Sequence, residues 1–163
     1  MTPMFPRLLT LALLALACRP APPPTAPTPS AIVGVWRVVR FCDVDSTGTL
    51  YEPFGPRPTG LFVYAPGGQL SIQVGATPPV PPFAQGDAAP TDAELQALYD
   101  ATFGYYGTYT VTSDSTVVHH VTGGTLPSYT GTDQRREYRI TGDSLTIGGN
   151  RTTWPCRLLI RER

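Results

Sequence analysis

Hydrophobic and polar residues alternate over most of the chain from residue 33 onward. Short runs with an apolar side chain at every second position are separated by clusters of Gly, Pro, Asp and Ser. This alternation is typical of antiparallel β-strands that bury one face and are joined by turns. It predicts eight strands, at Val33–Cys42, Thr59–Ala65, Gln69–Gly75, Tyr105–Thr112, Thr116–Thr122, Gln134–Ile140, Ser144–Gly148 and Arg157–Glu162.

One helix interrupts the strand pattern. Thr91 and Glu94 have the spacing of a capping box, in which each side chain bonds the other residue's free backbone amide. The helix that follows is amphipathic, and its apolar side carries Leu95, Leu98, Tyr99 and Thr102 or Phe103. The preceding segment, Ala76–Pro90, is rich in proline, so we expect a long loop that is a candidate lid.

Eight strands in one small domain favour either a sandwich or an up-and-down barrel. The cysteines favour the barrel, because the first and last strands of a closed meander are neighbours. Cys42 ends the first predicted strand, and Cys156 directly precedes the last. We therefore predict an all-β fold, an eight-stranded up-and-down antiparallel barrel with one short helix over residues 31–163. A disulfide between Cys42 and Cys156 would join the seam in an exported protein.

The N-terminal residues predict export. Residues 1–17 contain one cation, Arg7, and then an apolar run too short to cross a bilayer, as in a secretory signal peptide. The alanine before Cys18 resembles a bacterial lipoprotein signal, which implies a lipidated Cys18; an ordinary signal peptide cut nearby is the alternative. Residues 18–30 are predicted to form a proline-rich linker. We expect a protein anchored by lipid in the cell envelope, on the periplasmic side of the outer membrane.

Composition narrows the possible functions. The formal net charge is zero, so no nucleic-acid partner is expected. All 12 cations are arginines, which excludes lysine Schiff-base chemistry and the Lys-containing phosphate loop. Two histidines and no C-x-x-C pair give no basis for a zinc site, and we expect no metal and no cofactor. Gly142-Asp143-Ser144-Leu145 matches the nucleophile block of a hydrolase family, but no histidine follows it, so we reject that function.

Strand alternation separates inward from outward residues in the stretch 134–140. One face carries Arg135, Glu137 and Arg139, and this charged face must lie outside. The other face, with Gln134, Arg136 and Tyr138, then points into the barrel. A buried arginine needs a partner, which is either an internal carboxylate or the head group of an anionic ligand such as a fatty acid. The alternative is an arginine near the barrel rim whose hydrogen bonds are satisfied without a ligand.

The neighbouring His119 and His120 must point to opposite sides of a strand, so they cannot bind one ion together. Alternation slightly favours His119 inside. A neutral interior histidine bonded to Tyr or Thr is the simplest interpretation, and a ligand-binding or general-base role is the alternative. The complete candidate ligand-binding set is Arg136, Tyr138, Gln134, His119, Tyr64, Tyr105 and Tyr109.

Several stretches together resemble the bacterial lipocalin-like domain family, which has calycin-type barrels. They are IVGVWRVVRF (32–41), YEPFGPRPTGLFVY (51–64), FGYYGTYTV (103–111) and the segment 117–147 with VVHHV and GTDQRR. The resemblance covers residues 31–163. It implies that Trp36, with Gly34 making room beside it, closes one barrel end beneath Arg161 or Arg163.

The function expected from this sequence is binding of a small hydrophobic or amphipathic molecule inside the barrel. Two alternatives stay open. One is a barrel enzyme of the isomerase or cyclase type that uses interior His and Tyr as acid–base groups. The other is a structural envelope protein whose barrel is filled by its own side chains.

Overall fold

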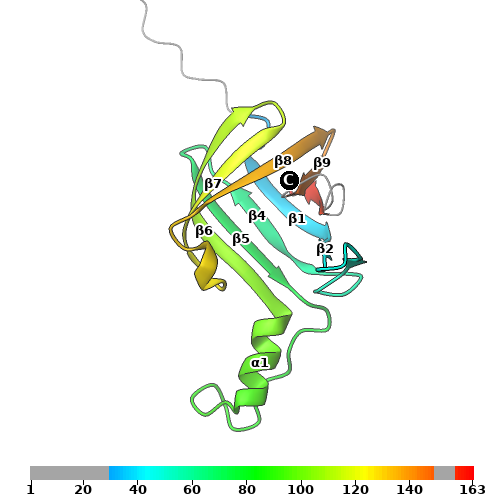
Figure 1. Ribbon diagram of the computed structural model, residues 1–163, viewed down its shortest axis with the longest axis vertical. Coiled ribbons are helices and arrows are strands. Elements are labelled where there is room, and N and C mark those ends of the chain that lie inside the picture. The colour runs from blue at the N-terminus through cyan, green and yellow to red at the C-terminus, as the bar shows by residue number, and fades with distance from the viewer. Residues whose placement is uncertain (1–29, 149–156) are drawn as a thin grey trace, which may run out of the picture.

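The computed structural model describes residues 30–148 and 157–163, which form a closed barrel of antiparallel strands (Figure 1). Each strand pairs with the next one along the chain, and the last pairs with the first. The predicted eight-stranded up-and-down barrel with one helix is therefore confirmed. Its strands are β1 (Gly34–Arg40), β4 (Thr59–Tyr64), β5 (Gln69–Gly75), β6 (Thr102–Ser113), β7 (Thr116–Gly124), β8 (Asp133–Thr141), β9 (Ser144–Gly148) and β10 (Leu158–Arg161).

The barrel closes between β1 and β10, where Trp36 pairs with Arg161 and Val38 with Leu159. Cys42 lies just after β1 and is buried, with 1% of its surface exposed. Cys156 lies outside the described residues, so the disulfide at this seam stays a prediction.

The structure adds elements that strand alternation did not predict. A two-stranded ribbon of β2 (Asp43–Val44) and β3 (Leu50–Tyr51) follows β1, and a short 3-10 helix, η1 (Pro127–Tyr129), lies between β7 and β8. The Asp45 carboxylate holds the ribbon's turn by accepting bonds from the N–H groups of Thr47 and Thr49. Strands of two residues are too short to show alternation.

The helix α1 (Asp92–Ala101) begins with the predicted capping box: the Thr91 hydroxyl accepts from the Glu94 N–H, and the Glu94 carboxylate accepts from the Thr91 N–H. No residue of α1 is buried, and Leu95, Leu98 and Tyr99 are exposed by 47%, 39% and 50%. Figure 1 shows the helix projecting away from the barrel. Its apolar side therefore does not pack on the barrel.

The proline-rich loop before α1 packs on the helix. The same Glu94 carboxylate accepts a bond from the Ala84 N–H, and Val80, Pro81, Pro82 and Phe83 line a shallow cleft that Leu98 also lines. Within the described residues, no helix is long and apolar enough to cross a membrane.

The inward-facing residues of the strands form the core. Each strand contributes alternate side chains, so a single layer of strands encloses one interior. The buried inward positions are Trp36, Val38, Phe62, Tyr64, Leu70, Ile72, Val74, Tyr105, Val117, His119, Val121, Tyr138, Leu145, Ile147 and Leu159. We call the end with the β4–β5, β6–β7 and β8–β9 turns the closed end. The opposite end, where α1 joins β6, is the open end.

Candidate functional site

Trp36 plugs the closed end. Its indole Nε1 donates to the Ile32 carbonyl at 2.8 Å, and the Arg161 guanidinium lies over its ring at 4.0 Å. Arg161 also donates to the carbonyls of Val33 and Ala31, each at 2.7 Å. The covering arginine is therefore Arg161, whereas Arg163 forms an exposed ion pair with Asp143.

Gly34 is required beside this plug for two reasons. Its φ of +141° lies in a region that L-residues with side chains rarely adopt, and a Cβ there would lie 2.6 Å from Nη1 of Arg161. The three residues expected to close the barrel, Gly34, Trp36 and Arg161, thus meet at one end.

The middle of the barrel holds a buried network of three side chains. His119 has no exposed surface, and its Nε2 lies 3.0 Å from the Tyr64 hydroxyl while its Nδ1 lies 2.6 Å from the Tyr105 hydroxyl. A neutral imidazole has one donor and one acceptor nitrogen, so one tyrosine donates to the ring and the other accepts from it. The network satisfies both ring nitrogens without any charge.

Burial keeps all three groups neutral. Desolvation, followed by the charges of Arg136 and His120, lowers the pKa of His119 to about 3. Burial also raises the pKa of the Tyr105 hydroxyl and raises that of Tyr64 well above its ordinary value. His119 is therefore a poor base at neutral pH.

Arg136 points into the barrel on the open-end side of this network. It is half-buried, and it donates to Oε1 of Gln134 at 3.1 Å and to the Arg135 carbonyl at 3.3 Å. A hydrogen bond from Arg136 and its charge both act to lower the pKa of Tyr105, although burial, the largest effect, leaves that pKa raised. No carboxylate of the described residues pairs with Arg136.

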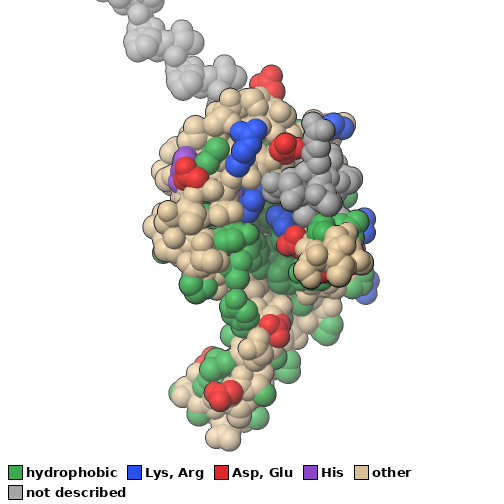
Figure 2. Space-filling model, in the orientation of Figure 1, with side chains coloured by type: hydrophobic (Ala, Val, Ile, Leu, Met, Phe, Trp, Pro, Cys, Tyr) green, Lys and Arg blue, Asp and Glu red, His purple; other side chains and the backbone are tan. Residues whose placement is uncertain are grey.

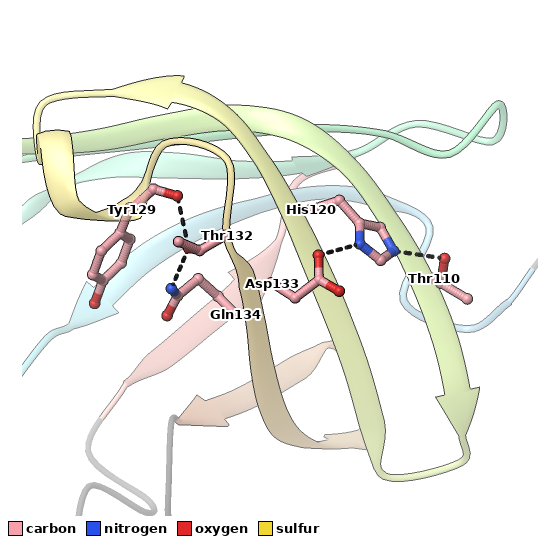
Figure 3. A network of polar contacts seen from close by, with 6 residues as sticks. All are labelled: Thr110, His120, Tyr129, Thr132, Asp133 and Gln134. Carbon is pink, nitrogen blue, oxygen red and sulfur yellow. Dashed lines mark hydrogen bonds and ion pairs between the residues drawn. The ribbon is translucent and has the colours of Figure 1, made fainter.

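Gln134 holds Arg136 in place and is itself held. Figure 3 shows its Nε2 donating to the Thr132 hydroxyl, which in turn donates to the Tyr129 carbonyl of η1; both distances are 2.7 Å. A row of three hydrogen bonds thus runs from η1 to the Arg136 guanidinium.

A second arginine, Arg157, lies at the open end and was not among the predicted site residues. Its side chain is only 13% exposed, its Nη2 bonds Asp43 at 3.1 Å, and its guanidinium lies 4.4 Å from the Phe41 ring centre. Its Nε is buried and has no hydrogen-bond partner among the described residues. The sequence places Arg157 at the start of the last predicted strand, but strand alternation could not reveal its role, because its partners Asp43 and Phe41 lie far away in the sequence.

Aromatic side chains pack against one another at the open end, in a cluster that we call the aromatic wall, and Phe41, Phe54 and Tyr105 in it are buried. Ring centroids lie 5.2 Å apart for Phe41 and Phe54, 5.9 Å for Phe41 and Phe103, and 5.6 Å for Phe103 and Tyr105. Tyr129 completes the wall against Phe103 and Tyr105. Figure 2 shows a hollow here in which apolar side chains lie next to cationic ones.

Two of the predicted ligand-binding tyrosines lie elsewhere. The hydroxyl of Tyr109 donates to the Ala65 carbonyl, and that of Tyr138 donates to the Ser113 carbonyl, both at turns of the closed end. Tyr105, Gln134 and Arg136 lie towards the open end, and Tyr64 and His119 lie deeper. The predicted ligand-binding residues therefore lie at different depths along the barrel axis and do not form one site.

His120 lies on the outside of the barrel. Its Nδ1 is 2.6 Å from Asp133 and its Nε2 is 3.0 Å from the Thr110 hydroxyl. Figure 3 shows these two contacts. Thr110 and Asp133 are exposed, and three neighbouring strands supply these residues. Within the described residues, no group of three or more His, Cys, Asp or Glu side chains could hold a metal ion.

A closed antiparallel meander with a plugged end and an apolar, cation-bearing open end has the architecture of the ligand-binding calycin-type barrels. The chain belongs to the lipocalin-like domain family, whose family model matches residues 33–157, from the first strand to Arg157. This confirms the resemblance drawn from the sequence. No curated protein matches the chain.

Proposed function

We propose that the barrel binds a small hydrophobic or amphipathic molecule at its open end and acts by sequestering it. The observation that carries this proposal is the pairing of the aromatic wall with an inward arginine, Arg136, that has no carboxylate partner among the described residues. Aromatic surface supplies affinity by removing apolar area from water, and a few polar groups fix orientation.

Export and lipid anchoring belong to the same proposal and are supported by the sequence of residues 1–30. The described chain enters the barrel at the closed end, where the Val33 N–H donates to the Ser30 carbonyl. A lipid on Cys18 and the linker 18–30 would therefore tether the closed end to the membrane. Figure 1 shows that the chain enters the barrel at the end opposite α1. In this proposal the open end would face away from the membrane and be accessible to dissolved or carried molecules.

Acid–base catalysis is the second candidate, and one observation favours it: the Tyr105 hydroxyl lies next to both His119 and Arg136. His119 is a weak candidate base, because both its ring nitrogens are occupied and its pKa is lowered to about 3. Any proton transfer would have to start from Tyr105. Sequestration therefore remains the better-supported function.

Native mass spectrometry of the purified protein tests the binding proposal directly. We expect a non-covalent adduct with the mass of a small lipid or similar molecule. A titration with the uncharged fluorescent probe N-phenylnaphthylamine should then show saturable binding that competes with the extracted molecule. A protein with no adduct and no saturable probe binding would contradict the proposal.

A matched pair of variants locates the site. Phe103→Ala shortens the aromatic wall and should weaken probe binding by about tenfold, the effect of losing one buried aromatic contact. Tyr106→Ala is the control, because Tyr106 lies on the same strand but is 54% exposed on the outer face. Equal affinities in the two variants would place the probe elsewhere.

A further inference from the structure

We propose that the open end recognises a carboxylate: Arg136, Arg157 and the Tyr105 hydroxyl bind the acidic head group of an amphipathic molecule whose apolar part lies on the aromatic wall. This inference rests on the proposed function and deepens it by naming the class of ligand. Arg157 and the pairing of the two arginines are new elements of the site.

The open end carries more positive than negative charge. Two guanidinium groups face this region, whereas the described residues pair one carboxylate, Asp43, with Arg157 and none with Arg136. Burial is the main cause that lowers the pKa of Arg157, and the positive charge of Arg136 lowers it further. Arginine stays charged at all physiological pH values, so one positive charge is left over at the edge of an apolar hollow. A single negative charge would balance it.

The described residues use only part of the hydrogen-bonding capacity of the two arginines. Within residues 30–148 and 157–163, the buried Nε of Arg157 has no partner, which is costly for a charged donor unless something else satisfies it. Among the described residues, Arg136 donates to neutral oxygens, those of Gln134, the Arg135 backbone and the Tyr105 hydroxyl. Guanidinium donors bond more strongly to ionised oxygens than to neutral ones, and their fork shape fits the two oxygens of a carboxylate.

The Tyr105 hydroxyl can supply a third hydrogen-bond donor. It accepts a hydrogen bond from Arg136, the charge of Arg157 also acts on it, and its ring belongs to the aromatic wall. When Tyr64 donates to Nε2 of His119, the Nδ1–H of His119 donates to the Tyr105 oxygen. The Tyr105 proton is then free to donate to a carboxylate. In this arrangement the buried network orients a third donor towards the ligand.

These features together select against other ligand classes. An uncharged alcohol would leave the excess positive charge unbalanced, and an organic cation would add to it. The apolar area of the wall adds affinity for an alkyl or aromatic chain, which a small inorganic anion lacks. A monocarboxylate with an apolar chain satisfies every group named above.

Competition between matched ligands tests the inference. Dodecanoate and dodecanol have the same chain and differ in the head group, and each is titrated at neutral pH against protein carrying N-phenylnaphthylamine. We expect dodecanoate to displace the probe at least about tenfold more effectively than dodecanol, the usual gain from charge-assisted hydrogen bonds.

Variants assign the effect to the two arginines. Arg136→Gln and Arg157→Lys should each weaken dodecanoate by about tenfold or more and leave dodecanol and the probe nearly unchanged. The lysine keeps the charge that pairs with Asp43 but removes the guanidinium fork. Arg135→Gln is the control, because it removes a neighbouring charge that points outward from β8.

The possible results distinguish failure of the carboxylate site from failure of the proposed binding function. Equal displacement by the acid and the alcohol would overturn the carboxylate site and leave the binding function intact. Variants that weaken probe and dodecanoate alike would also overturn it, since the arginines would then support the barrel rather than the ligand. A wild-type protein that binds neither probe nor dodecanoate would contradict the proposed function itself.

Discussion

The Tyr105 hydroxyl and Nδ1 of His119 lie 2.6 Å apart in the middle of the barrel, with Tyr64 bonded to the other ring nitrogen. This geometry stabilises a neutral imidazole and makes protonation of His119 costly. The folded-state pKa of His119 is about 3, against 6.5 for an unperturbed histidine. Between these values the unfolded chain binds a proton that the folded chain does not.

The protein should therefore lose stability on acidification below about pH 6.5, with a slope from this group that approaches roughly 1.4 kcal/mol per pH unit near pH 5. The stabilisation is fully present above pH 6.5. Urea unfolding at several pH values measures the slope. His119→Gln should abolish this slope, and His120→Gln, which changes the outer face, should keep it. A wild-type stability that is flat over this range would contradict the neutral network.

Removal of the Arg161 side chain should destabilise the closed end of the barrel. Arg161→Ala loses two hydrogen bonds to backbone carbonyls and the contact with the Trp36 ring, so we expect a loss of about 2–4 kcal/mol in unfolding free energy. Denaturant unfolding followed by fluorescence measures it. The control, Arg163→Ala, removes only an exposed ion pair and should hardly change the midpoint. Equal losses in both variants would contradict the assignment of Arg161 as the residue that covers Trp36.

Gln134 is expected to act by positioning Arg136. Gln134→Leu removes the bonds to Arg136 and Thr132 while keeping a similar volume. Dodecanoate affinity should fall several-fold, because the guanidinium loses its fixed orientation, and probe affinity should change little. Competition titrations measure both. If Gln134→Leu weakens the probe as much as dodecanoate, Gln134 supports the barrel instead.

The predicted Cys42–Cys156 disulfide can be tested on protein exported into an oxidising compartment. We expect no free thiol in denaturant without reductant, and a loss of about 2–5 kcal/mol when Cys42 and Cys156 are both replaced by serine. Thiol titration and denaturant unfolding measure these effects. Two free thiols in the mature chain would contradict the pairing.

Strand alternation predicted the barrel correctly because each strand buries one face in a common interior. It also predicted the side of the sheet for Arg136, His119 and Tyr138, whose positions the structure bears out. Alternation does not tell how far along the barrel axis a side chain lies. Alternation therefore groups Tyr109 and Tyr138 with Arg136, although their hydroxyls donate to carbonyls of turns at the closed end.

Other features depend on contacts that no local pattern encodes. Arg157 becomes part of the site through Asp43 and Phe41, which are more than a hundred residues away in the sequence. The apolar face of α1 has the spacing of a packed helix, yet the connection to β6 carries the helix away from the barrel. Amphipathic spacing shows that a face is apolar and does not show what covers it.

The junction of α1 and β6 limits how the open end can move. Thr102 caps the helix and is the first residue of the strand, and the Ala76 N–H donates to the Ala101 carbonyl at 2.8 Å. No linker separates helix and strand, so Phe103 lies only two residues after the end of α1. A swing of α1 would therefore act directly on Phe103 and on its contacts with Phe41 and Tyr105.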